Sequence, residues 1–120
     1  MTDDAERKRM KAFVIAERLK EWDTSVFATY GPLAAASIAK FGGRYLALST
    51  AIVSLEGPSP PLAIGVIEFP SVEQARNWYA SNEYQDAALI RRSGAENRFI
   101  LVAEDAAAHL VPQLAQVDDE

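Results

Sequence analysis

The chain has 120 residues, a net charge of −5 and 49% hydrophobic residues, which is the length and composition of one globular domain. Its 12 basic residues are scattered, so nucleic acid is not an expected partner. It has no cysteine, which excludes disulfides, thiol nucleophiles and thiolate metal sites. No apolar run approaches the ~20 residues of a membrane span, and the charged start lacks a secretory signal. We therefore expect a cytoplasmic protein with no membrane partner.

Residues 1–10 are charged and offer little to bury, so they predict a flexible tail or a short frayed helix. Strands are predicted where β-branched and aromatic residues gather, over residues 11–19, 44–55, 62–69 and 98–104. The folded domain is therefore expected over residues 11–104. The remaining residues, 105–120, contain a run of alanine, one proline and an acidic end, and are predicted to form a C-terminal tail.

Two helical segments are predicted between these strands. The first begins after Asp23 or Thr24 and ends at a glycine pair, and Gly31-Pro32 predicts a kink or two abutting segments within it. The second starts at Val72, because Ser71 followed three residues later by Gln74 forms a capping box. It is expected to be recapped near residue 81 and to end by residue 94.

The predicted order is strand, helix, strand, strand, helix, strand. This is the split βαβ arrangement of a ferredoxin-like α+β sandwich, in which a four-stranded antiparallel sheet carries both helices on one face. The third strand, however, is apolar on both sides, with Leu62, Ile64 and Val66 opposing Ala63, Ile67 and Phe69. An antiparallel sheet with one wet face should instead alternate apolar and polar residues.

The second apolar face predicts a homodimer. About eight such side chains left in water would forgo on the order of 12–24 kcal/mol of burial, which is comparable with the whole stability of a domain. The simplest cover is a second copy, packed sheet against sheet across a two-fold axis.

Several short motifs carry a family resemblance, and they occur in order along the chain: Gly42-Gly43-Arg44-Tyr45, Leu55-Glu56-Gly57, Glu68-Phe69-Pro70-Ser71, Ala75-Arg76, Trp78-Tyr79 with Ser81, Glu83 and Tyr84, and Arg98 leading into Leu101-Val102. Residues 11–104 thereby resemble the bacterial family catalogued as domain of unknown function 1330, of the dimeric α/β barrel superfamily. The resemblance implies a ferredoxin-like fold and a sheet-to-sheet dimer. It implies no activity.

Charged residues on or beside the apolar strands are the first candidates for a site. One interpretation makes Glu68 a catalytic general base with a raised pKa, with Arg44 or Arg98 binding an anionic ligand. The alternative, which we favour, is a structural Glu–Arg pair at a strand end or dimer rim. Burial beside a cavity would favour the first interpretation, and pairing with arginine would favour the second.

Three tyrosines, Tyr45, Tyr79 and Tyr84, are further candidates for binding a small ligand between helix and sheet, because aromatic walls with phenol hydroxyls suit a small planar molecule. Trp78 has the helical spacing of a core residue. The alternative for the tyrosines is that they bridge core and surface.

Other chemistry finds no support in the sequence. His109 is the only histidine and has no cluster with metal-ligand spacing, and the glycines form no phosphate-binding pattern, so we expect no metal and no cofactor. Two hypotheses remain. The protein is a cofactor-independent enzyme resembling small monooxygenases or isomerases, or it is a non-catalytic dimer that binds a small ligand or acts as a structural module.

Overall fold

The computed structural model describes residues 4–104, so the expected tail at 105–120, with His109, lies outside the described residues. The chain folds into four strands and four helices in the following order: α1 (Asp4–Arg9), β1 (Ala12–Glu21), α2 (Val26–Lys40), β2 (Arg44–Ser49), β3 (Ala63–Phe69), α3 (Val72–Ala80), α4 (Asn82–Arg92) and β4 (Ala95–Ala103). None of the helices within residues 4–104 has the length and apolar composition of a membrane span.

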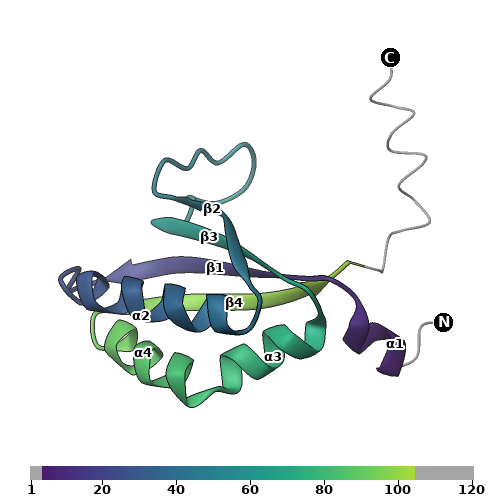
Figure 1. Cartoon of the computed structure of the whole chain (residues 1–120). Coiled ribbons are helices and arrows are strands. Elements are labelled where there is room, and N and C mark those ends of the chain that lie inside the picture. The colour runs from purple at the N-terminus through teal and green to yellow at the C-terminus, as the bar shows by residue number, and fades with distance from the viewer. Residues whose placement is uncertain (1–3, 105–120) are drawn as a thin grey trace.

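The strands form one antiparallel sheet in the order β2-β3-β1-β4. Helices α2, α3 and α4 all lie on one face of the sheet, and no helix of the described chain covers the other (Figure 1). This confirms the ferredoxin-like α+β fold expected from the order of the elements.

The largest errors in the predicted strand bounds are at the end of β2 and the start of β4, and β1 also runs two residues beyond its predicted end, to Glu21. Strand β2 ends at Ser49 rather than at residue 55, because a long loop over residues 50–62 replaces its second half. The loop extends away from the helices (Figure 1), and Leu55 within it is 96% exposed. Strand β4 begins at Ala95, three residues early, because it pairs with the end of β1 beyond an irregularity in register after Arg18.

The predicted break at Pro32 is not a division into two helices. Helix α2 runs continuously through Pro32 to Lys40. The proline lies in the second turn with its ring exposed, where the loss of one backbone donor costs less than ending the helix there.

Both helix starts near Pro70 are capped by serine. The side-chain oxygen of Ser71 accepts from the backbone N–H of Gln74 at 3.0 Å, and Ser81 does the same for Tyr84 at 3.2 Å. The predicted start at Val72 is confirmed, and the expected recapping near residue 81 is seen as a separate helix, α4.

The core lies between the sheet and the three helices. Its largest fully buried side chains are Phe69, Trp78 and Tyr84, so Trp78 is a core residue as its spacing predicts. The Trp78 indole N–H donates to the buried Ser37 hydroxyl at 2.9 Å, and that hydroxyl donates to the Ala34 carbonyl. Every polar atom in this chain of contacts therefore has a partner.

The face without helices, here called the open face, is built from rows of directly paired residues. Ile15 at its centre pairs with Val66 on one side and Ile100 on the other. The rows above and below add charge at their ends, through Glu68 beside Arg44 and Glu17 beside Arg98. An apolar centre with charges near its rim is the pattern of a protein interface.

Candidate functional site

Glu68 lies on the open face and is held by two cations. Arg44 donates through Nε to one carboxylate oxygen at 2.8 Å, and Lys11 Nζ lies 3.1 Å from the other. The side chain is 14% exposed. The structure therefore contains the Glu–Arg pair at a strand end that the second interpretation described.

The hydrogen bond from Lys11, followed by that from Arg44, lowers the pKa of Glu68 below its ordinary value of 4.5. The expectation that Glu68 is a general base with a raised pKa is therefore wrong. The physical cause of the lowered pKa is simple: opposite charges on both sides favour the ionised carboxylate. Glu68 lies at a rim of the open face and helps to hold β1, β2 and β3 together.

Glu68→Gln should lower the free energy of unfolding at neutral pH. A folded-state pKa below the unfolded value contributes stability above pH 4.5, and this contribution is lost as the pH falls through the lowered pKa. The difference between wild type and variant should therefore shrink on acidification, as measured by urea unfolding from pH 7 to pH 3. Glu17→Gln is the control, because its ion pair with Arg98 is longer, at 3.7 Å, and its effect should be smaller. An equal loss in both variants would contradict this account.

The predicted site residues divide between the two faces of the sheet. Glu68, Arg44 and Arg98 lie on the open face, because strand alternation places them opposite helix-facing neighbours such as Phe69 and Phe99. Tyr45, Tyr79 and Tyr84 contribute to the helix side instead. The structure therefore does not bring Glu68 and Tyr79 into one site.

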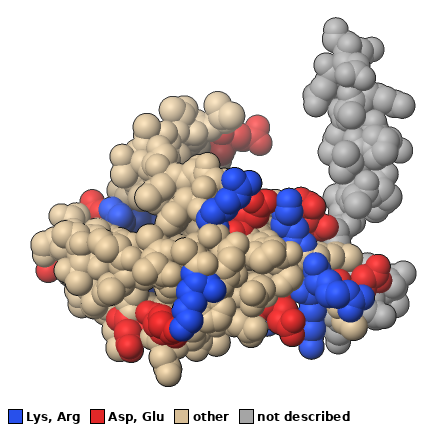
Figure 2. All heavy atoms as spheres, in the orientation of Figure 1, with Lys and Arg blue, Asp and Glu red and all other residues tan. Residues whose placement is uncertain are grey.

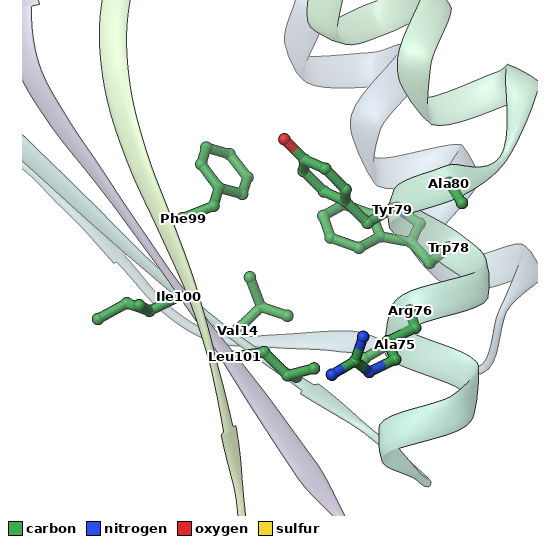
Figure 3. A pocket seen from close by; sticks show the side chains of 9 residues that line it. All are labelled: Val14, Ala75, Arg76, Trp78, Tyr79, Ala80, Phe99, Ile100 and Leu101. Atoms are coloured by element: carbon green, nitrogen blue, oxygen red, sulfur yellow. The ribbon is translucent and has the colours of Figure 1, made fainter. Parts of the chain in front are cut away.

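Two hollows lie on the helix side. The larger, about 510 Å³, is a groove between edge strand β4 and helix α3 (Figure 3). Phe99 and Leu101 form one wall and Trp78 and Tyr79 the other, and Arg76 is its one charged lining residue. No buried polar atom without a partner lines this groove. It is open and mostly apolar, and it contains few groups that could orient a ligand.

The smaller hollow, about 200 Å³, lies between the sheet and helices α2 and α4. We call it the helix-side pocket. It exists because the helix-facing positions of the central strands are small there, with Ala16, Ala63 and Gly65 leaving space under the helices. Aromatic walls come from Phe27, Tyr30, Tyr45 and Phe99.

Unpartnered polar atoms concentrate at this pocket. Three buried side-chain atoms of the described chain have no hydrogen-bond partner, namely Arg18 Nε, Arg91 Nε and Asn97 Oδ1. All three residues line the helix-side pocket. Because an unpaired buried polar group costs free energy, such groups gathered at one cavity indicate a site whose partner is a ligand.

Tyrosine hydroxyls add donors to the same region. The hydroxyls of Tyr30 and Tyr84 are 2.9 Å apart, so one donates to the other, and Tyr30 and Tyr45 line the pocket. Burial, followed by the neighbouring Tyr84, raises the pKa of Tyr30, and burial also raises the pKa of Tyr84 and of Tyr45. All three tyrosines are therefore protonated at neutral pH and able to donate a hydrogen bond.

The pocket contains two cationic side chains but no acid, since no Asp or Glu is among the residues that line it. Arg18 stacks on the Phe27 ring at 3.6 Å and pairs with Glu21 at 3.0 Å. Arg91 is 4% exposed and pairs with no carboxylate of the described chain. No group of three or more metal-ligating residues occurs within residues 4–104.

The sequence interpretation missed Arg18, Tyr30, Arg91 and Asn97. A signal existed for Arg91, which follows Tyr84 and Ala88 at spacings of seven and three residues and so lies on the buried face of α4. Arg18 and Asn97 likewise share the parity of helix-facing neighbours in their strands. The surface charges do not indicate a binding site, because Lys and Arg are interspersed with Asp and Glu over the face drawn in Figure 2.

The sequence pattern of the family described as domain of unknown function (DUF1330) matches residues 11–105. The chain belongs to the DUF1330 family. This confirms the resemblance carried by the motifs between Gly42 and Val102. No curated protein matches the chain.

Solved structures similar to this DUF1330 chain share its fold at low identity. A protein of unknown function from Rhodopseudomonas palustris has a TM-score of 0.67 at 17% identity, covering 85% of this chain and 88% of that one. An ethyl tert-butyl ether D (EthD) family protein from Bacillus halodurans has a TM-score of 0.57 at 15% identity, with 80% of this chain and 100% of that one covered. SnoaB, a cofactor-independent oxygenase from Streptomyces nogalater, has 0.55 at 13%, with 83% and 97% covered. These identities support the fold alone.

Proposed function

We propose that this DUF1330 protein is a homodimer that binds a small organic molecule in the helix-side pocket of each subunit. The observation that carries the proposal is the gathering of Arg18 Nε, Arg91 Nε and Asn97 Oδ1, all unpartnered, at one cavity. A volume of about 200 Å³ is below the ~300–1,000 Å³ of pockets for drug-sized ligands, so the ligand is a small metabolite.

The dimer is proposed from the open face. Its centre is apolar, with Val66, Ile15 and Ile100 in one row, and Ile100 and Val102 remain exposed in the single chain. A second copy packed sheet to sheet would cover these side chains and leave the helix-side pocket accessible in each subunit. Light scattering at micromolar concentration should give the mass of two chains, and a monomer mass would contradict the proposal.

A cofactor-independent oxygenase or isomerase is the second candidate. Its support is the set of donors around the pocket, since Arg91 and the tyrosine hydroxyls would stabilise a substrate anion. The pocket-lining residues include no carboxylate or histidine to take a proton, so such a substrate would have to lose its proton to water. Glu68 cannot serve as this base, because it lies on the opposite face of the sheet. Binding without catalysis is therefore the function the geometry supports best.

Gly31→Leu should abolish ligand binding while the protein stays folded. Gly31 lines the pocket in helix α2, and a Cβ added there would meet no atom within 4 Å other than those of its own helix backbone and its two chain neighbours, so a larger side chain can occupy pocket space. The measurement is a screen of small organic compounds by thermal shift, with native mass spectrometry of the purified wild type for a retained molecule.

Ala36→Leu is the matched control, since it adds the same side chain to an exposed position of α2 outside the pocket. Compounds that raise the Tm of wild type should also raise that of Ala36→Leu, and they should leave Gly31→Leu unchanged. Equal shifts in all three proteins would place the binding elsewhere and contradict the proposal.

A further inference from the structure

Arg91 is the one pocket residue whose charge has no counter-ion in the described chain. The side chain is 4% exposed and its Nε has no hydrogen-bond partner. Its contacts are all neutral: the hydroxyl of Tyr84, the ring of Phe99 at 4.6 Å and the ring of Tyr30 at 5.7 Å. Aromatic faces attract a cation but accept none of the five N–H bonds that a guanidinium offers.

A buried charge of this kind is costly unless something neutralises it. Arg18 differs in this respect, because Glu21 already neutralises its guanidinium at 3.0 Å. Since no acid lines the pocket, the counter-ion of Arg91 has to come from outside the described chain. The planar guanidinium fork matches the two oxygens of a carboxylate, which it can bind through two parallel hydrogen bonds.

The other residues that line the pocket indicate the shape of that anion. Phe27, Tyr30 and Phe99 provide aromatic walls, and about 200 Å³ has room for a single ring. Asn97 Oδ1, which lacks a donor, can accept from a hydroxyl or amino group next to the carboxylate.

We propose that the ligand of the helix-side pocket is a carboxylate carried on a single ring, with Arg91 as its counter-ion. This rests on the proposed function and specifies its ligand class. It assigns different roles to two neighbouring arginines of α4. Arg91 binds the ligand, whereas Arg92 is exposed and donates to Gln85 Oε1 and the Tyr79 hydroxyl, each at 3.4 Å.

The test compares benzoate with benzamide, which has nearly the same shape and no charge, by titration calorimetry. Wild type should bind benzoate at least about tenfold more tightly than benzamide, since hydrogen bonds to charged groups are strong. In Arg91→Met this preference should fall to about onefold, and in the control Arg92→Met it should be unchanged. Equal affinities in wild type, or a preference that survives in Arg91→Met, would overturn the proposal.

A second measurement keeps the test valid if Arg91→Met does not fold. In nitrogen-resolved NMR of the wild type, benzoate should shift the Arg91 Nε–H resonance and benzamide should not. Identical shifts with both compounds, or none with benzoate, would overturn the proposal. If neutral compounds bind equally well and Gly31→Leu blocks them, the pocket still functions and only the carboxylate assignment fails. If nothing that binds depends on residue 31, the proposed function itself fails.

Discussion

Trp78→Ala should lower the free energy of unfolding by about 3–5 kcal/mol, as is usual when a large buried aromatic side chain is removed. Trp78 is fully buried, and the centroid of its ring lies 4.2 Å from the ring centroid of Tyr84 and 5.2 Å from that of Phe69. Truncation would leave a cavity under the sheet and remove the donor to Ser37. Urea unfolding at one fixed protein concentration measures the loss, because the stability of the proposed dimer would depend on concentration.

The other tryptophan is the control. Trp22 is 63% exposed, and its indole N–H donates to the Ser93 carbonyl at 3.0 Å. Trp22→Ala should therefore cost about 1 kcal/mol, the value of one hydrogen bond. If the two alanine variants lost the same stability, the core would not be centred on Trp78 as described.

Ile15→Glu should convert the proposed dimer into a monomer. Ile15 lies on central strand β1 in the middle of the open face, between Val66 and Ile100. A carboxylate there would be buried without a partner in a sheet-to-sheet dimer, which costs at least about 3 kcal/mol, or more than a hundredfold in the dissociation constant. In the single chain the same side chain would face water, so the monomer should remain folded.

Light scattering with circular dichroism measures both parts of this prediction. Leu89→Glu is the control, because Leu89 is exposed on α4, on the helix side of the molecule, and its substitution should leave the dimer intact. A folded Ile15→Glu variant that still has the mass of two chains would show that the open face is not the interface.

Much of the fold was predictable because it depends on patterns with a fixed period. The order of strands and helices and the capping serine at 71 depend only on local spacing, and they agree with the structure. The end of β2 was not predictable in the same way. Residues 50–55 contain alanine, isoleucine, valine and leucine, which suit a strand, but a strand also needs a neighbour, and β3 begins only at Ala63.

The site was only partly predictable. Charged and aromatic residues indicate which side chains could bind a ligand, but they do not indicate which face of the sheet each side chain lies on. Glu68 and Tyr45 are neighbours across β2 and β3, yet they face opposite sides of the sheet. Alternation within each strand could have separated them once the helix-covered face was known. The importance of Arg91 depends on a contact it does not make, and no sequence pattern shows that a buried cation lacks an acid nearby.

Gly65 is a position at which the sheet does not have its most stabilising residue. A glycine inside a central strand weakens it, and alanine would fit at this position, where an added Cβ has its nearest contact at 3.4 Å with Leu48. With Ala16 beside it, the position forms a sheet surface of small side chains under the helices. Larger residues there would fill the space, increase apolar burial and make the protein more resistant to heat. A variant selected only for thermal tolerance would therefore be expected to fill positions 16 and 65 first, and to lose room for a ligand as it did so.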